Sequence, residues 1–265
     1  MEKTRKTPRF LVPVVWVVGV IVAWELISFL LAVVLKDPQA DKKLPYLHDV
    51  VASFFQNAHM MLQAGGVTLS RAALGFVLGC GIGFVLAVLM SLTKIIEKIA
   101  MPYLLIMQMI PILGLAPIIF SLVKDLDNSR IVIATYISFY PIALNTLSGF
   151  QAVSKDRKDL LYTYAAKRPT VYCKLMIPSA LPALFTGMRI AAPMAVTASI
   201  LVDMLSNKDG IGSIMIMALY GGSNKFWPAV LTGILMGILS IAIVSLAQWI
   251  CIPWQRKSAK RRGAA

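Results

Sequence analysis

Four polar side chains lie within long apolar segments of this 265-residue chain and are its first candidates for chemistry. They are two carboxylates and two amides: Glu25, Asp203, Gln108 and Asn145. A charged or amide group in hydrocarbon is costly and usually faces a partner or a water-filled cavity. Glu25 suits either a hydrogen bond to a neighbouring helix or a part in substrate passage, and Asn145 suits a bridge between helices. We therefore expect these residues to contact a solute pathway or to link helices.

The sequence lacks the patterns that normally carry catalytic or nucleotide-binding groups. No GxxxxGK[ST] pattern occurs, so we expect no ATP site of that kind. His48 and His59 lie far from any paired nucleophile and form no HExxH pattern. Cys80, Cys173 and Cys251 are widely separated and have no metal-ligand spacing. We expect no catalytic residue, no metal and no cofactor in this chain, which is not an enzyme on this interpretation.

The elements that must position these residues are membrane helices. Apolar residues make up 58% of the chain, and the mean hydropathy is +0.76, above what a water-soluble domain of this length carries. The first apolar run is longer than a signal-peptide core, so we expect it to be retained. Because about 20 apolar residues cross a bilayer, we predict one all-α polytopic membrane domain over 1–265 with six spans, at about 10–35, 68–92, 99–123, 130–150, 178–205 and 226–252.

The basic residues indicate how these spans are oriented. The chain has 26 Lys and Arg against 12 Asp and Glu, a formal net charge of +14. In a membrane protein such a balance is more often a topology signal than a sign of nucleic-acid binding. When the N-terminus is placed in the cytoplasm, most of the basic residues fall on the cytoplasmic side. We therefore expect both termini to be cytoplasmic and no nucleic-acid partner.

Glycine and proline mark two further features of the spans. Glycines at four-residue spacing clear one face of a helix so that another backbone can approach: Gly75, Gly79 and Gly83 in the second span, and Gly233 and Gly237 in the sixth. These faces predict close helix packing, within the chain or between subunits, although glycine is also simply common in membrane helices. Pro111 and Pro117 predict a bend or interruption of the third span. Such breaks accompany either a water-filled cavity or a plain kink.

The segment 151–177, between the fourth and fifth predicted spans, is polar and basic. Its Lys155–Lys174 stretch is a helix candidate, and Asp159 lies near the start, where a carboxylate suits the helix dipole. Pro178 and Pro182 then open the next span, where a missing N–H costs little. A short helix fixed to two spans is suited to receiving a push from a soluble partner; the alternative is an ordinary surface loop.

The sequence resembles the membrane permease subunits of binding-protein-dependent ABC importers, in particular the nitrate, taurine and aliphatic sulfonate branch. IPSALPALFTGMRIA, from Ile177, is similar to the family run LPxALPxxxxGLRxA. TLSRAALGFVLGCGIGFVLA, MPYLLIMQMIPILGLAPIIF and LVDML followed by DGIGSIM are similar to other family blocks, with Asp203 in place of the usual glutamate. The resemblance covers essentially the whole chain, and the order and spacing of its blocks agree.

The family's cytoplasmic loop begins with EAA, followed by a glycine. Counting back from Pro178 places Asp159, Leu160 and Leu161 at the EAA positions and Ala165 at the glycine. Only Asp159 is a conservative replacement. Pro169 also stands where the family usually continues its helix, which predicts a shortened or kinked coupling helix and an ATPase with an adjusted groove.

The resemblance implies a type I ABC importer permease with a cytoplasmic coupling helix between the fourth and fifth of about six transmembrane helices. It implies a multi-pass protein of the bacterial inner membrane, surrounded by lipid and paired with a second permease copy, most simply as a homodimer. A separate ABC ATPase would hold ATP and Mg, and an extracytoplasmic solute-binding protein would deliver substrate. The implied coupling residues are Asp159, Leu160, Leu161, Ala165, Lys167, Arg168 and Pro178.

Two functions of other classes compete with the importer. A stand-alone secondary carrier would favour inverted repeats and ionisable groups near the midplane, whereas we find no convincing repeat and only Glu25 deep in a span. A non-transporting scaffold would use its loops for docking alone. Under the importer interpretation the solute is a small organic or inorganic one, such as nitrate, a sulfonate, taurine or a vitamin precursor.

Overall fold

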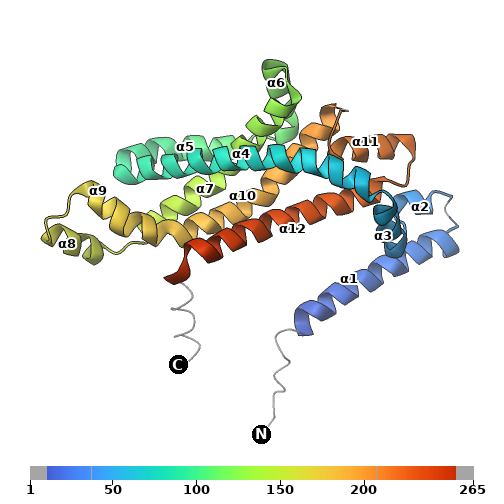
Figure 1. Ribbon diagram of the computed structural model, residues 1–265, viewed down its shortest axis with the longest axis horizontal. Helices are drawn as coiled ribbons and strands as arrows, with labels where there is room; N and C mark the ends of the chain where they lie inside the picture. The colour runs from blue at the N-terminus through green and yellow to red at the C-terminus, as the bar shows by residue number, and fades with distance from the viewer. Residues whose placement is uncertain (1–10, 37, 207, 255–265) are drawn as a thin grey trace, which may run out of the picture.

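The computed structural model describes residues 11–36, 38–206 and 208–254, and over these ranges the chain is helical without a β-strand. Five helices are long and apolar enough to cross a membrane, or six spans are present if one bent pair counts as a single span. The predicted all-α polytopic fold is confirmed. Figure 1 shows an elongated bundle with α8 and α9 at one end and α2, α3 and α11 at the other.

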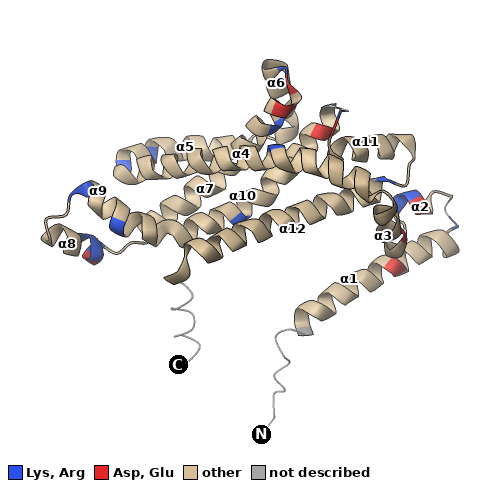
Figure 2. Cartoon of the chain, in the orientation of Figure 1, with Lys and Arg blue, Asp and Glu red and all other residues tan. Residues whose placement is uncertain are grey.

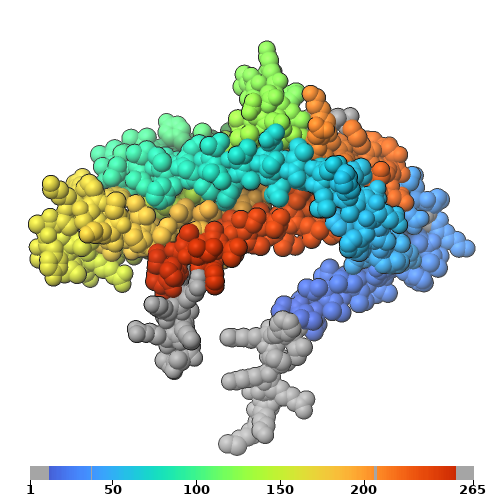
Figure 3. Space-filling view, viewed as in Figure 1, coloured from blue at the N-terminus to red at the C-terminus, as the bar shows by residue number. Residues whose placement is uncertain are grey.

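The first helix, α1 (Leu11–Phe29), continues through a π-helical turn at Leu30–Val34 and diverges from the bundle (Figures 1 and 3). Only 6% of its apolar stretch is buried, so its apolar side chains are available to lipid or another chain. The short helices α2 (Ala40–Lys43) and α3 (Leu47–Gln56) return the chain to the bundle. Trp24 Nε1 donates to the Pro45 carbonyl at 3.0 Å, which ties α1 to this connection.

The centre of the bundle is α7 (Leu126–Gln151), which lies between α4 (Ala58–Leu92) and α10 (Ile177–Ser206). The apolar stretch of α7 is 44% buried, against 28% for α4, because α7 packs on both sides. The helices α11 (Ile211–Gly221) and α12 (Phe226–Cys251) pack against α10. The side chains at the ends of this bundle are therefore positioned chiefly by α4, α7 and α10.

The expected third span, 99–123, is not one helix. It divides into α5 (Lys94–Met109) and α6 (Ile112–Val123), which are bent by 96° relative to each other. Pro111 has φ −64° and ψ 123°, and Ile110 before it is also extended, as steric contact with the proline ring favours. Pro117, in contrast, lies inside α6 without interrupting it. The interruption is thus at Pro111, and α6 projects away from the bundle (Figure 1).

The helical run that forms the fifth span begins earlier than expected. After α8 (Lys155–Thr163), α9 (Arg168–Val171) continues through a π-helical turn at Tyr172–Met176 into α10. Pro169 occupies the first turn of α9, a favourable proline position, and does not kink α8. Pro178 lies inside this run rather than opening a span. The π turn accommodates it: the Ile177 N–H bonds to the Tyr172 carbonyl, and the next residue needs no acceptor.

Candidate functional site

One candidate site is the exposed end of the bundle formed by α8 and α9. Asp159 and Leu160 on α8 are exposed, Leu160 to 57%, and Lys167 and Arg168 are exposed at the start of α9. Figure 2 shows basic residues gathered at this end. Leu161 turns the other way and packs against the buried cluster that includes Val171 and Met176. The structure therefore brings the expected coupling residues together on one surface, with two exceptions: Leu161 faces the core, and Pro178 lies farther along the helical run.

The end of α8 is closed by a turn centred on Ala165. Ala165 has a left-handed φ of 53°, its N–H donates to the Tyr162 carbonyl at 2.9 Å, and the Ala166 N–H donates to the Leu161 carbonyl at 3.1 Å. This pairing is the Schellman motif, whose left-handed position is usually glycine because a Cβ is disfavoured there. The family glycine position identified from the sequence therefore has the backbone conformation that glycine favours, although this chain has alanine.

The base of this loop is attached to α4 and α7. The Tyr172 hydroxyl lies 3.0 Å from the Ser91 hydroxyl on α4, and the Tyr172 ring makes an edge contact with Phe150 on α7. Gln151 Nε2 donates to Glu97 Oε1 at 2.9 Å, joining α7 to α5. A displacement of α8 and α9 would consequently act on several long helices.

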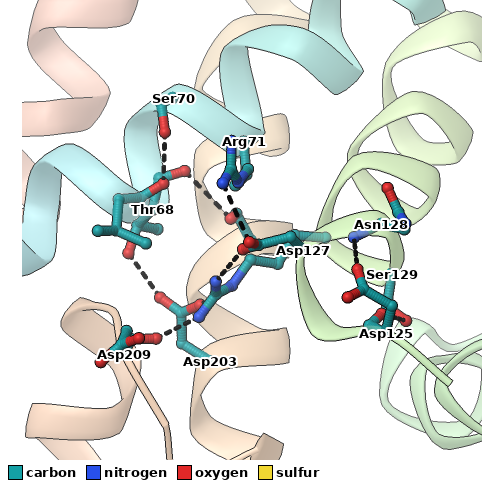
Figure 4. A network of polar contacts seen from close by, with 12 residues as sticks. Thr68, Ser70, Arg71, Asp125, Asp127, Asn128, Ser129, Asp203 and Asp209 are labelled. Carbon is teal, nitrogen blue, oxygen red and sulfur yellow. Dashed lines mark hydrogen bonds and ion pairs between the residues drawn. The ribbon is translucent and has the colours of Figure 1, made fainter.

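A second candidate site is a buried network of ion pairs at the opposite end of α10. Arg130 on α7 is 1% exposed and Asp203 on α10 is 0% exposed; Arg130 Nε lies 2.5 Å from Asp203 Oδ1. Another Arg130 nitrogen donates to Asp127 Oδ1 at 2.7 Å, and Asp127 Oδ2 accepts from Arg71 on α4 at 3.0 Å. Figure 4 shows Arg71, Asp127 and Asp203 converging from three helices. Two guanidinium groups and two carboxylates thus compensate one another's charge.

The same network holds the connection from α10 to α11. Arg130 also donates to the Asp209 carbonyl, and the Thr68 hydroxyl donates to Asp203 Oδ2 at 2.6 Å while accepting from the Ile211 N–H at 3.0 Å. Gly210 has φ 119°, and a Cβ there would collide with the Asp203 carboxylate. Glycine is needed at this turn both for its backbone conformation and for the space beside the ion pair.

Sequence reasoning selected Asp203 and missed its partners. Arg130, Asp127 and Arg71 are not among the candidate residues that the sequence indicates. Arg130 is the first residue of the predicted fourth span, and that placement is a signal for a partner inside the bundle. Which carboxylate it would meet depended on how α7 packs against α10.

The structure places Glu25 and Asn145 away from this network. Glu25 Oε1 accepts from the Leu47 N–H at 3.0 Å, so its carboxylate links α1 to the start of α3. Asn145 Nδ2 donates to the Pro141 carbonyl of its own helix at 2.7 Å, and it lies opposite Gly187 of α10. The hydrogen bond assigned to the Asn145 side chain is therefore intrahelical rather than the expected link between helices.

Gln108 borders a cavity of about 390 Å³ at the break between α5 and α6. Tyr136 and Tyr140 of α7 and Met194 of α10 complete much of its wall. The Tyr136 hydroxyl donates to the Met107 carbonyl, an acceptor close to the break. Gln108 itself is exposed.

The glycines of the second span face α7 within the same chain. A Cβ at Gly75 would lie 2.5 Å from the Ala134 Cβ, and one at Gly79 would lie 2.6 Å from the Ser138 Cβ; Gly83 is equally close to α7. Gly233 faces the ends of the Ile200 and Met215 side chains, whereas a Cβ at Gly237 would meet nothing within 4 Å. The packing surface expected at both glycines of α12 is thus present within the chain only at Gly233.

Comparison with known proteins gives a family for this arrangement. The family described as binding-protein-dependent transport system inner membrane component matches residues 79–257. A formylaminopyrimidine transport permease protein, ThiX, from Halalkalibacterium halodurans is 31% identical over 72% of this chain and 76% of its own length. A nitrate import permease protein, NrtB, from Synechococcus elongatus is 25% identical over 80% and 76%, and a putative aliphatic sulfonates transport permease protein, SsuC, from Bacillus subtilis is 24% identical over 71% and 69%.

A solved structure shows the same fold. The crystal structure of an amino acid ABC transporter with histidines matches with a TM-score of 0.60 over 76% of this chain and 97% of that chain. Its sequence identity is 15%, so this likeness concerns the fold alone.

Proposed function

The chain belongs to the family of binding-protein-dependent transport system inner membrane components. It is an ABC importer permease of the branch that contains the nitrate and sulfonate permeases. We propose that its transport cycle is driven by an ATPase held on another chain. The α8–α9 surface docks a separate ABC ATPase, on which ATP and Mg are held. A solute-binding protein delivers substrate at the opposite end of the bundle. The solute itself is a small organic or inorganic molecule; the relatives' names include formylaminopyrimidine, nitrate and aliphatic sulfonates.

The observation that carries this proposal is the attachment of an exposed helix to a long helical run. The α8 helix is joined through the Ala165 turn to the run Arg168–Leu205, which ends beside the buried Asp203 network. At about 1.5 Å per residue, such a run is long enough to cross a bilayer with length to spare. Movement of α8 by the ATPase would therefore be transmitted to the far end of the bundle and bias it between two states.

The distribution of basic residues indicates which end of the bundle faces the cytoplasm. By the positive-inside rule, the basic residues around α8 and α9 support a cytoplasmic location for this end, where a soluble ATPase is available. Both termini then lie on the cytoplasmic side of a bacterial inner membrane. A second copy of the chain completes the pathway, and the exposed apolar surfaces of α1 and α6 are available for it or for lipid.

The test is reconstitution with defined components. The purified chain alone should neither bind nor hydrolyse ATP, whereas with its ATPase and its solute-loaded binding protein ATP hydrolysis should rise above the rate without solute. A matched preparation in which the loop 155–167 is replaced by a neutral linker should no longer retain the ATPase. Strong ATP turnover by the chain alone, or full retention of the ATPase by the linker variant, would contradict the proposal.

A further inference from the structure

The cavity at the break between α5 and α6 has polar groups in its wall. Tyr136 and Tyr140 lie about halfway along the 26-residue α7, so the cavity is near mid-bundle. Neither the Gln108 amide nor the Tyr140 hydroxyl makes a hydrogen bond to any described residue. Unsatisfied amide and hydroxyl groups are costly in hydrocarbon. Water or a solute is therefore needed to satisfy them.

The helix break adds backbone groups to this wall. At Pro111 the last α5 carbonyls and the first N–H groups of α6 lack intrahelical partners, apart from the Met107 carbonyl, which accepts from the Ile110 N–H and the Tyr136 hydroxyl. Ile110, Pro111 and Ile112 all line the cavity. The carboxyl end of α5 carries partial negative charge and the amino end of α6 partial positive charge. The cavity consequently offers hydrogen-bond donors and acceptors together and no net helix charge.

Among the residues that the structure describes, no charged side chain lines the cavity. Arg130, which precedes Tyr136 on the same helix, is 1% exposed and already bonded to Asp203, Asp127 and the Asp209 carbonyl. A small anion would find no cation available to it here. Aromatic rings on α7 instead supply flat surfaces suited to stacking.

A second cavity at membrane depth provides a comparison. It measures about 330 Å³ between α4, α10 and α12, and its wall is apolar except for Ser70 and Ser240. Both of these hydroxyls already donate to carbonyls of their own helices. That cavity suits a lipid chain. The cavity at the break is of similar volume, and of the two only it is lined by polar side chains, those of Gln108 and Tyr140, that lack partners among the described residues.

We propose that the cavity lined by Gln108, Tyr136 and Tyr140 is a solute contact site of the translocation pathway and that it selects an uncharged, planar heteroaromatic solute over small inorganic or sulfonate anions. The inference rests on the proposed importer function and narrows its solute class. The rings of α7 contact the face of the solute, and Gln108 and the helix ends bond to its polar edge.

Cysteine accessibility tests the site directly. Cys80, Cys173 and Cys251 are replaced by serine, Q108C is introduced, and the chain is reconstituted in lipid with its ATPase. L78C is the matched control: Leu78 is 53% exposed, and it lies at the same depth because its neighbour Gly79 packs against Ser138, between the two tyrosines. We expect a water-soluble cationic methanethiosulfonate to modify Q108C roughly tenfold or more faster than L78C, because a thiol in lipid is not ionised and does not meet a charged reagent.

Protection by added solutes tests the selectivity. Cytosine, an uncharged pyrimidine, should slow the modification of Q108C, whereas nitrate and ethanesulfonate at the same concentration should leave it unchanged. Absence of modification, as expected if a second copy of the chain filled the cavity, would overturn the inference. So would equal protection by the anions, or no protection by cytosine.

The same preparation separates this inference from the function on which it rests. If the cysteine-free parent retains its ATPase and shows solute-stimulated hydrolysis while Q108C behaves like L78C, only the cavity assignment is wrong. If the parent fails to retain the ATPase, the proposed function and this inference are both overturned.

Discussion

Arg130 on α7 and Asp203 on α10 stand 73 residues apart in the chain and form a buried ion pair with Nε and Oδ1 2.5 Å apart. Both side chains are almost completely excluded from solvent, at 2% and 0%. The pair also holds the α10–α11 connection through the Asp209 carbonyl. The end of the Arg168–Leu205 run that lies farthest from α8 is therefore held to the central helix α7 by an ion pair.

Removal of one member of this pair should be strongly destabilising. Arg130→Met leaves the Asp203 carboxylate buried without its cation, which typically costs about 3–5 kcal/mol. We expect a clear fall in the unfolding temperature of the purified chain in detergent. The double variant Arg130→Met with Asp203→Asn retains an oxygen for Thr68 and removes both charges, so it should recover part of the loss. A double variant that loses as much as the two single variants combined would contradict the buried pair.

The packing of α4 on α7 gives a second prediction with a control on the same helix. Gly79→Ala puts a methyl group 2.6 Å from the Ser138 Cβ and 2.9 Å from the Thr135 carbonyl, and overpacking of this kind costs about 1–3 kcal/mol. Gly81→Ala meets no atom within 4 Å and should be neutral or slightly stabilising. The measurement is the unfolding temperature of both variants. Equal effects at the two positions would show that this face of α4 does not pack as described.

The left-handed turn after α8 predicts that a glycine substitution stabilises this turn. Ala165→Gly relieves a left-handed alanine, a conformation that costs a non-glycine residue roughly 1–2 kcal/mol. The amide protons of the turn should exchange more slowly, with solute-stimulated ATP hydrolysis retained. Ala166→Gly, in the same loop but without positive φ, should bring no such protection. Faster exchange in Ala165→Gly would refute the turn geometry.

The charges on the α8–α9 surface should determine coupling to the ATPase. Asp159→Lys or Lys167→Glu reverses an exposed charge on the proposed docking surface, so each variant should lose solute-stimulated ATP hydrolysis or retention of the ATPase. Because both side chains are exposed, the unfolding temperature should stay unchanged. Lys124→Glu, after α6, is the control and should retain the ATPase. Unchanged solute uptake and unchanged assembly with the ATPase in both variants would show that the α8–α9 stretch is an ordinary surface loop.

Local features of the sequence are sufficient to predict the helical elements and to identify the family. Span length follows from runs of apolar residues, and the glycine and proline positions are visible along a single helix. The order of several motif blocks identified the permease family before any contact was known. Ala165 was placed at the family glycine by spacing alone, and its left-handed backbone agrees with that placement.

Other features were decided only by tertiary packing. Pro111 interrupts the third span and Pro117 does not, although both are prolines in an apolar run, because Ile110 and Pro111 adopt an extended backbone where α6 turns away. Arg130 meets Asp203 because the packing of α7 against α10 brings the two together. Hydropathy and propensity act over a few residues, whereas these pairings depend on which helices lie next to each other. The sequence by itself thus determined the membrane helices and their family, and the tertiary structure decided which polar groups meet inside them.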